Sequence, residues 1–189
     1  MGKIILFCSV SIDGMFEDAD GSLEWATVDE ELHQHFNDEL KLMGAFLGGR
    51  VSYEMMAEYW PTADQDPSAP ATIIEYAGIW RSMPQVVYSR TLESVGPNAT
   101  LVRSVDPLEV EELKRATHGD MVMGGAVLSA TFLDLDLIDE VWLYVHPVVL
   151  GQGRRLFGDR AAPWPLSLES TRTFTSGVVM LRYGRRAAS

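Results

Sequence analysis

Short apolar segments alternate with amphipathic segments through the first two-thirds of the sequence. The apolar segments are short and β-branched enough to be buried strands, at residues 3–9, 45–48, 85–89 and 120–123. Helical spacing or helix-capping residues mark the segments between and after them, at about 28–42, 50–58, 107–117 and 126–133. Strands that alternate with helices in this way form a mostly parallel sheet covered on both faces. The pattern therefore predicts an α/β fold.

The first predicted helix has two independent signals. Thr27 and Glu30 have the spacing of a capping box, with Thr27 as the N-cap residue. Apolar residues then recur at helical spacing at Val28, Leu32, Phe36, Leu40 and Met43. We therefore expect an amphipathic helix from about residue 28 to 42.

The last third of the sequence contains three further predicted strands, at 140–146, 165–170 and 178–183. The last two are joined by residues 171–177 and are expected to form an antiparallel hairpin at the end of the sheet. The sequence has no internal repeat, and 189 residues are enough for one well-packed domain. We therefore predict a single domain over residues 1–189.

Charge and composition exclude several classes of function. A net charge of -12 argues against binding to nucleic acid or to an anionic membrane, because both need a basic face. The only apolar stretch near the N-terminus, Ile4 to Val10, is too short for a signal peptide or a membrane span. A single cysteine, Cys8, excludes an internal disulfide and fits a reducing cytoplasm. An anionic ligand must then be held locally, by the few arginines that lie beside glycines.

Two glycine pairs follow predicted strands and precede predicted helices. They lie in Gly48-Gly49-Arg50 and in Met123-Gly-Gly-Ala126. In a parallel sheet these junctions lie along one edge, where backbone N–H groups and the helix dipole attract phosphate. A Cβ atom there would block the close approach of a ligand and would disfavour positive φ. Two such turns suggest two phosphate contacts, although neither turn has the GxGxxG pattern of dinucleotide-binding folds.

Histidine and cysteine give no metal-binding pattern. His33 and His35 are two residues apart on the predicted helix and point to different faces. His146, at the end of a predicted strand, is the one histidine that we expect near a binding site. We predict no metal site.

Several short motifs occur in an order that resembles a known family. They are Ser11-Ile-Asp-Gly14, Gly49-Arg-Val-Ser-Tyr-Glu54, Val87-Tyr-Ser-Arg-Thr-Leu92, Met123-Gly-Gly125, and Leu137-Ile-Asp-Glu140 followed by Pro147 to Gly153 and Leu156-Phe157. Over nearly its whole length the chain resembles the reductase domain at the C-terminus of the bifunctional riboflavin-biosynthesis protein (RibD), in the dihydrofolate reductase superfamily. The resemblance implies a dihydrofolate reductase-like three-layer sandwich that binds NADPH at the carboxyl edge of its sheet.

The resemblance also implies which residues hold the cofactor. The adenosine 2'-phosphate is expected at Gly49, Arg50, Ser52, Ser89 and Arg90, and the pyrophosphate at Met123, Gly124, Gly125, Ala126 and Val127. Cys8 and Ser9 would border the nicotinamide, and the segment from Asp13 to Trp25 would close over it. An arginine fork suits a dianionic phosphate, so NADPH should bind at least ~10-fold more tightly than NADH.

The substrate half of the site is less defined. Candidate substrate-binding residues are Trp25, Asp29, Leu128 and His146, and candidate catalytic residues are Asp13 and Glu30, although the capping box also explains Glu30. Met123 replaces the Glu that usually precedes the double glycine in riboflavin-pathway reductases, and Trp25-Ala-Thr replaces their phosphate-binding segment. These differences argue against the phosphoribosylamino-pyrimidine of that pathway as substrate.

Two functions follow from these motifs. The first is a cytoplasmic NADPH-dependent reductase of a small pteridine- or aminopyrimidine-like heterocycle. The alternative is a non-catalytic homodimer that binds a nucleotide, flavin or pteridine.

Three structural expectations accompany these functions. The apolar strand at 178–183 should offer an exposed edge to a second copy of the chain. The resemblance also implies that Gly151-Gln-Gly153 packs near that contact and shapes the sheet edge. The Gly124–Gly125 peptide should be cis, as in dihydrofolate reductases, despite a cost of ~2.5 to 4 kcal/mol.

Overall fold

The computed structural model describes residues 1–158 and 163–186. The chain groups into two compact units, each assembled from separate parts of the sequence. The first unit comprises Met1–Gly2 and Glu30–Val122, and the second comprises Lys3–Asp29 and Met123–Ser189. The single domain expected from chain length stays a prediction.

Three parallel strands form the sheet of the first unit. They are β3 (Ala45–Gly49), β4 (Gln85–Tyr88) and β5 (Ala99–Val102), in the order β5-β4-β3. The register pairs Gly49 with Tyr88 and Tyr88 with Val102. The carboxyl ends of the three strands are therefore aligned, and the residues that follow them lie on one edge.

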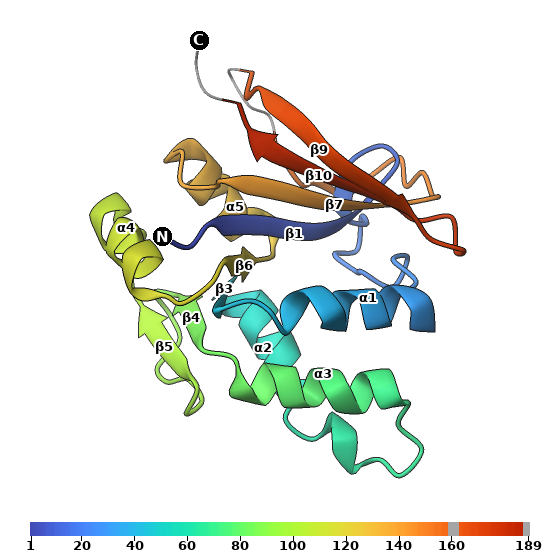
Figure 1. Cartoon of the computed structure of the whole chain (residues 1–189), viewed down its shortest axis with the longest axis horizontal. Coiled ribbons are helices and arrows are strands. Elements are labelled where there is room, and N and C mark those ends of the chain that lie inside the picture. The colour runs from blue at the N-terminus through green and yellow to red at the C-terminus, as the bar shows by residue number, and fades with distance from the viewer. Residues whose placement is uncertain (159–162, 187–189) are drawn as a thin grey trace. The chain divides into compact units, whose positions relative to one another are not determined.

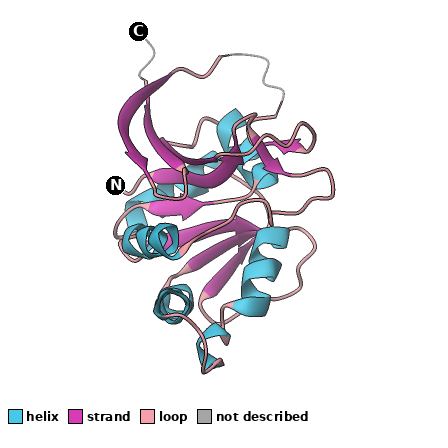
Figure 2. Cartoon of the chain, turned by 90° about the vertical axis from the view of Figure 1, so that its right-hand side faces the viewer, coloured by secondary structure: helices cyan, strands magenta, loops and turns pink. Residues whose placement is uncertain are grey.

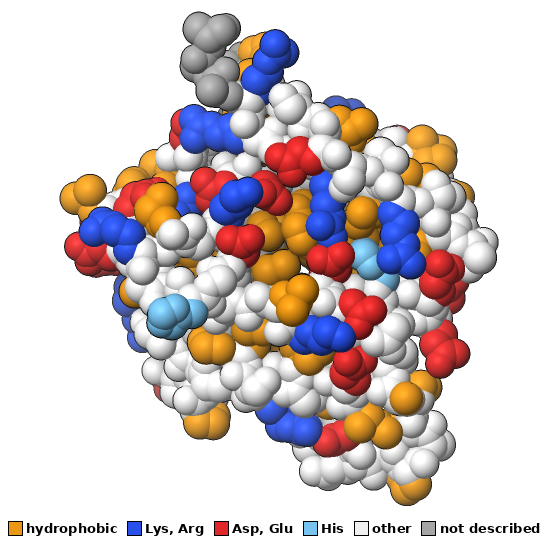
Figure 3. All heavy atoms as spheres, viewed as in Figure 1, with side chains coloured by type: hydrophobic (Ala, Val, Ile, Leu, Met, Phe, Trp, Pro, Cys, Tyr) orange, Lys and Arg blue, Asp and Glu red, His pale blue; other side chains and the backbone are white. Residues whose placement is uncertain are grey.

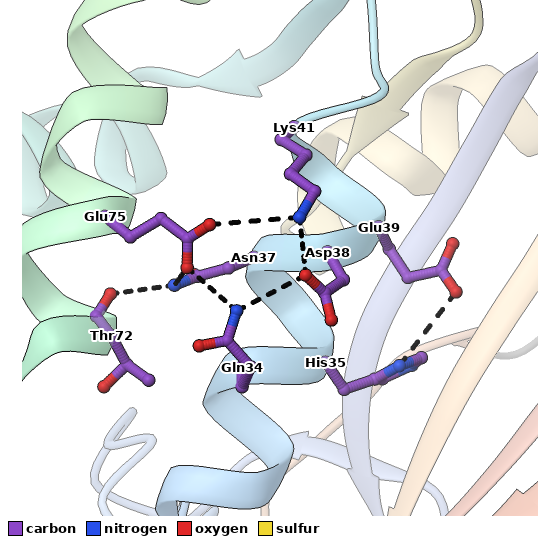
Figure 4. A network of polar contacts seen from close by, with 8 residues as sticks. All are labelled: Gln34, His35, Asn37, Asp38, Glu39, Lys41, Thr72 and Glu75. Atoms are coloured by element: carbon purple, nitrogen blue, oxygen red, sulfur yellow. Dashed lines mark hydrogen bonds and ion pairs between the residues drawn. The ribbon is translucent and has the colours of Figure 1, made fainter.

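Four α-helices belong to the first unit: α1 (Glu30–Leu40), α2 (Arg50–Tyr59), α3 (Ala71–Ser82) and α4 (Pro107–Ala116), with a short 3-10 helix at Ala63–Gln65. Helices α1 and α3 lie side by side (Figure 1). A polar network joins them, in which buried Asn37 donates from Nδ2 to the Thr72 carbonyl at 2.8 Å and to Glu75 at 3.0 Å (Figure 4). As the sequence predicts, Asp106 caps α4 by accepting a hydrogen bond from the Leu108 N–H, with Pro107 in the first turn.

Helix α1 begins later than its capping signal predicts. Its first residue is Glu30, and the Thr27 N–H donates to the Trp25 carbonyl. Thr27 is therefore not the N-cap, and Val28 is 43% exposed instead of lying on the buried face. The buried face contains Leu32 and Leu40 as expected, but also His35 and Asn37.

The second unit contains the mixed part of the sheet. Its strands are β1 (Ile4–Ser11), β7 (Glu140–His146), β10 (Val179–Arg185) and β9 (Leu166–Thr173), in the order β1-β7-β10-β9. Strand β1 is parallel to β7, whereas β10 is antiparallel to both β7 and β9. The long strands of the β9–β10 hairpin are visible in Figure 2. A mostly parallel fold that ends in an antiparallel hairpin is confirmed.

Three shorter strands and one helix complete the description. Strand β6 (Met121–Met123) leads through Gly124 and Gly125 into α5 (Ala126–Asp134). Strands β2 (Met15–Glu17) and β8 (Arg154–Arg155) form a separate antiparallel pair. Within the described residues, no helix has the length and apolar character needed to cross a membrane.

The C-terminal strand is not an edge strand, so that part of the dimer prediction is wrong. Strand β10 hydrogen-bonds to β7 on one side and to β9 on the other. The strand order places β9 at the end of the sheet, and every residue of β9 except Leu166 is exposed. The hairpin pairing continues through Thr173, three residues beyond the predicted strand, and this extension covers β10.

Candidate functional site

The turn between β3 and α2 presents an arginine at the start of a helix. Gly49 is the N-cap of α2, with φ -86° and ψ 173°, and no side chain caps the helix. The exposed Arg50 guanidinium donates from Nη1 to Glu54 one turn later, at 2.7 Å. The first N–H groups of α2 are thus without a side-chain acceptor, and Arg50 is held by a surface ion pair that costs little to break.

The turn after β4 is built by a serine hydroxyl. Ser89 is buried, and its Oγ accepts hydrogen bonds from the N–H groups of Thr91 at 3.2 Å and Leu92 at 3.0 Å. Arg90 lies within this turn and is exposed. Since Gly49 pairs with Tyr88, the Gly49-Arg50 and Ser89-Arg90 turns lie on the same edge of the first unit.

A third arginine on this edge is absent from the sequence-based prediction. Arg103 directly follows β5 and donates from Nη1 to the Ser89 carbonyl at 3.1 Å and the Leu92 carbonyl at 2.6 Å. The sequence signal for it is an arginine directly after Thr100-Leu-Val102, a β-branched run too short to predict a strand by itself.

In the second unit, the Gly124–Gly125 turn differs from its prediction. No described peptide bond is cis, so the expectation of a cis bond is wrong. Gly125 instead has φ 90° and ψ 125° as the N-cap of α5. A positive φ redirects the chain into the helix without the cost of a cis bond, so the expected strained peptide is not needed. Ser129 Oγ donates to the Gly125 carbonyl at 2.8 Å and holds the turn.

Cys8 lies beside this turn at 3% exposure. Burial raises the pKa of its thiol to about 12, and a hydrogen bond from the Gly125 backbone opposes this shift only in part. The thiol is therefore protonated and unreactive at neutral pH, which fits a packing role beside the glycine turn.

Ser9 and His146 face each other at the carboxyl ends of β1 and β7. His146 Nε2 lies 3.0 Å from Ser9 Oγ, and the Trp25 and His146 rings pack edge to face with centroids 5.6 Å apart. His146 is 3% exposed, and burial lowers its pKa, so the ring is neutral at pH 7. The structure thus brings together two predicted substrate-binding residues and one predicted cofactor-binding residue.

The other predicted substrate and catalytic residues are more dispersed. Leu128 is half-buried in α5, and Asp29 is the half-buried last residue of its segment in the second unit. Glu30 is the exposed first residue of α1 and belongs to the first unit. Nothing in its surroundings marks it as a catalytic acid.

Asp13 anchors a loop. Its carboxylate accepts hydrogen bonds from Ser11 Oγ at 2.6 Å, the Gly151 N–H at 2.7 Å and the Leu150 N–H at 3.1 Å. These donors, Ser11 first, lower its pKa to about 2. An ionised carboxylate whose oxygens accept three hydrogen bonds is poorly suited to donate a proton at neutral pH, so its geometry supports an anchoring role.

The segment Gly151-Gln-Gly153 packs against the residues that follow Asp13. Gly153 has φ 141°, and a Cβ atom at this position would lie 2.0 Å from the Glu17 carbonyl. Arg154 and Glu17 form an ion pair at 2.8 Å between β8 and β2. Gly153 therefore allows two loops of one unit to meet, and the contact with a second copy stays a prediction.

The same two loops line a hollow of about 380 Å³, formed by Asp18, Ala19, Asp20, Leu150, Gly151 and Gln152. None of the predicted site residues lines it. Among the described residues, no group of three histidine, cysteine or acidic side chains could hold a metal ion.

Two observations fit the residues to an anionic cofactor. Both α2 and α5 start at a glycine N-cap without a side-chain cap, which leaves backbone N–H groups for a ligand. A Cβ atom at Gly48 would meet no atom within 4 Å, and at Gly124 only the Phe7 carbonyl at 3.8 Å. The packing of the protein thus does not require glycine at either position, whereas a ligand that approaches the backbone closely would.

Comparison with known proteins gives a family match over most of the sequence. The sequence profile of the RibD C-terminal domain matches residues 2–180. The chain belongs to the RibD C-terminal domain family. It is 36% identical to the uncharacterized protein YyaP of Bacillus subtilis, over 96% of this chain and 94% of that protein.

Solved structures show the same fold. A putative riboflavin biosynthesis protein from Shewanella sp. PV-4 has a TM-score of 0.75 and 22% identity, with 98% of this chain and 99% of that chain covered. Acinetobacter baumannii RibD has a TM-score of 0.70 and 18% identity, and the match covers 98% of this chain but 58% of RibD. The dihydrofolate reductase-like fold expected from the motifs is confirmed, and the family supports an oxidoreductase of the pyrimidine reductase type.

Proposed function

We propose that this protein is an NADPH-dependent reductase that transfers hydride to a small planar heterocycle of the pteridine or aminopyrimidine class. The observation that carries the proposal is the alignment of Arg50 with the Ser89-Arg90 turn on one strand edge, together with uncapped glycine starts at α2 and α5. Family membership supports the reductase class.

The proposed cofactor contacts form two groups. Arg50, Ser52 and Arg90 would bind the adenosine 2'-phosphate, with the Ser89 hydroxyl free to donate its proton while it accepts the two turn N–H groups. The Gly124-Gly125 turn and the first turn of α5, from Ala126 to Val127, would bind the pyrophosphate. When bound, NADPH supplies the hydride, so the protein needs only to orient the reactants and exclude water.

Ser9, Trp25 and His146 form the best-supported part of the substrate site. The Trp25 indole Nε1–H is buried without a protein acceptor, and a heterocycle with a ring nitrogen or carbonyl could supply one. The neutral imidazole of His146 can accept or donate one hydrogen bond beside Ser9. These groups suit a flat, polar-edged ring better than an aliphatic substrate.

The test combines binding with turnover. Calorimetric titration with NADPH and NADH should give tighter binding of NADPH, and NADPH absorbance should fall when pterins, dihydropterins or aminopyrimidines are added. NADPH consumption that depends on one of these compounds would support the reductase. Equal affinity for the two cofactors would contradict the 2'-phosphate assignment.

The state of Asp13 favours the second candidate, a non-catalytic nucleotide-, flavin- or pteridine-binding protein. Its carboxylate, one of the two predicted catalytic groups, is ionised and anchors a loop. Tight NADPH or flavin binding without oxidation by any member of the substrate panel would support this alternative.

We also propose that the protein is a homodimer. Strand β9 is an edge strand of the sheet, and one face of the hairpin presents Leu168 at 55% exposure beside half-buried Leu181 and Tyr183. An exposed edge strand with an apolar face invites pairing with a second copy. Light scattering at micromolar concentration should give twice the 21.0 kDa chain mass, and a monomer would refute the proposal.

A further inference from the structure

The strand edge of the first unit gathers three arginines in an acidic protein. Arg50 follows Gly49, Arg90 lies two residues after Tyr88, and Arg103 follows Val102, while the register pairs Gly49 with Tyr88 and Tyr88 with Val102. The chain has 15 Lys and Arg residues against 27 Asp and Glu residues. On the face drawn in Figure 3, basic side chains are interspersed with acidic ones and form no continuous basic patch. Three arginines that follow adjacent strand ends are therefore a local feature, and Arg103 has no role in the sites assigned so far.

The hydrogen bonds of Arg103 show what it does in the free protein. Its Nη1 group donates to the carbonyls of Ser89 and Leu92, the two ends of the turn that contains Arg90. Ser89 Oγ accepts the Thr91 and Leu92 N–H groups inside the same turn. Two groups thus stabilise the turn: the Ser89 hydroxyl, which belongs to the turn, and the Arg103 guanidinium, which follows a neighbouring strand. Hydrogen bonds from a charged donor are about twice as strong as neutral ones, so removal of Arg103 should loosen the turn.

We infer that Arg103 is a specificity-determining positioning residue, which braces the Ser89–Leu92 turn so that Ser89 and Arg90 are preorganised for a terminal phosphate monoester, the group that distinguishes NADPH from NADH. The inference rests on the proposed function. Preorganisation raises affinity because less conformational entropy is lost on binding. The guanidinium also adds positive charge at the edge, which favours a dianionic phosphate over a hydroxyl.

The test uses the full-length protein and compares Arg103→Ala with Arg115→Ala. Arg115 is an exposed arginine on α4 that donates to the Glu111 carbonyl, so its removal changes the net charge equally without touching the turn. Calorimetric titration should show that Arg103→Ala weakens NADPH binding by about 10-fold and NADH binding by much less, whereas Arg115→Ala changes neither. Equal behaviour of the two variants would overturn the inference.

Hydrogen exchange without cofactor gives a second, independent readout. The amides of Thr91 and Leu92 should exchange faster in Arg103→Ala and at the wild-type rate in Arg115→Ala and Arg90→Ala. Unchanged protection in Arg103→Ala would overturn the bracing role. Arg103→Lys keeps the charge, so restored NADPH preference without restored protection would also overturn it and assign a purely electrostatic effect.

The two measurements separate this inference from the proposed function. If the wild-type protein binds NADPH and NADH equally, the cofactor assignment fails, while the exchange data still decide whether Arg103 braces the turn. If the wild type prefers NADPH and Arg103→Ala retains that preference, the proposed function stands and the specificity role of Arg103 is wrong.

Discussion

The two turns that open α2 and α5 have similar sequences and different backbones. Each has a glycine pair between a strand and a helix, and in each the second glycine is an uncapped N-cap. Gly49 has φ -86° and ψ 173°, which any residue can adopt, whereas Gly125 has φ 90° and ψ 125°, which strongly favours glycine. The backbone conformation therefore favours glycine at Gly125 but not at Gly49, although the two residues have the same place in the motif.

The first glycine of each pair supports a different explanation. The protein leaves space for a methyl group at Gly48 and at Gly124. The packing of the fold therefore does not explain why these two residues are glycine, whereas the proposed close approach of a cofactor would. Gly125 is thus a glycine that its backbone conformation favours, whereas Gly48 and Gly124 are proposed to be glycines because of a ligand, and each assignment can be tested.

The largest expected effect is on folding stability at Gly125. Gly125→Ala places a Cβ atom on a backbone with positive φ, which should lower the free energy of unfolding by about 1–3 kcal/mol. Gly49→Ala is the matched control and should cost less, because its backbone is in the extended region. Urea unfolding of both variants measures the difference. Equal losses would show that the two turns are not distinguished by their backbones.

The next effect is on cofactor selection in the first unit. Arg50→Ala should remove most of a preference for NADPH of about 10-fold, while the unfolding free energy changes by less than about 0.5 kcal/mol, because only an exposed ion pair with Glu54 is lost. Glu54→Gln should raise NADPH affinity slightly, since it frees the guanidinium. Binding titrations of both variants check this prediction, and an unchanged preference in Arg50→Ala would remove Arg50 from the site.

Acidification should distinguish a titratable loop anchor from a permanent one. The pKa of Asp13 in the folded protein, about 2, lies below its ordinary value of 3.8, so its stabilisation is complete well above 3.8 and is lost as pH falls through 3.8 toward 2. The Arg103 brace stays charged over this range. As pH is lowered, the hydrogen-exchange protection of the Leu150 and Gly151 amides, corrected for the intrinsic rate, should therefore be lost at a higher pH than that of the Thr91 and Leu92 amides. Parallel loss at both loops would contradict the anchoring role, and Asp13→Asn should abolish the difference.

The smallest effect concerns the glycines with free space. Gly124→Ala should leave the fold nearly unchanged and weaken NADPH binding, because only a ligand is crowded. Gly78, in α3, also has room for a methyl group, since a Cβ atom there would meet nothing within 4 Å. Gly78→Ala should therefore stabilise the helix by about 0.5–1 kcal/mol without affecting binding. Thermal unfolding measures the stability of both variants, and NADPH titration measures their affinity. Unimpaired binding by Gly124→Ala would show that no ligand approaches this backbone closely.

The sequence predicted those elements whose signals are local. Strand β7 and helix α4 carry clear apolar runs or caps and were found. Helix α3 was missed because its N-cap residue, Pro70, has no capping side chain. Exposed Ile74 also lies opposite its buried face, which weakens the helical period. Strands β2, β5 and β8 are two to four residues long, and such strands depend on partners far away in the sequence.

The sequence predicted which residues belong to the candidate site better than it predicted their conformations and contacts. Motif order placed Arg50 and Ser89 on one edge, because the strands before them are parallel neighbours. The anchoring role of Asp13 was missed, since two of its three donors, Leu150 and Gly151, lie about 137 residues away in the sequence. Gly125 was assigned a cis bond by resemblance, and no sequence signal distinguishes that bond from a positive φ.

The discontinuous second unit has a consequence for synthesis of the chain on the ribosome. Strand β1 pairs with β7 from Ile5 opposite Glu140 onward, so the apolar N-terminal strand is made long before its neighbour. At about 5–20 residues per second, roughly 7 to 27 seconds separate the two. Nearly all of the first unit is synthesised in that interval and can form its internal contacts. The edge of Ile4–Ser11 that pairs with β7 remains unpaired during this time. We therefore expect the Ile4–Ser11 segment to be exposed to wrong pairing and aggregation for most of the time that the chain takes to be made.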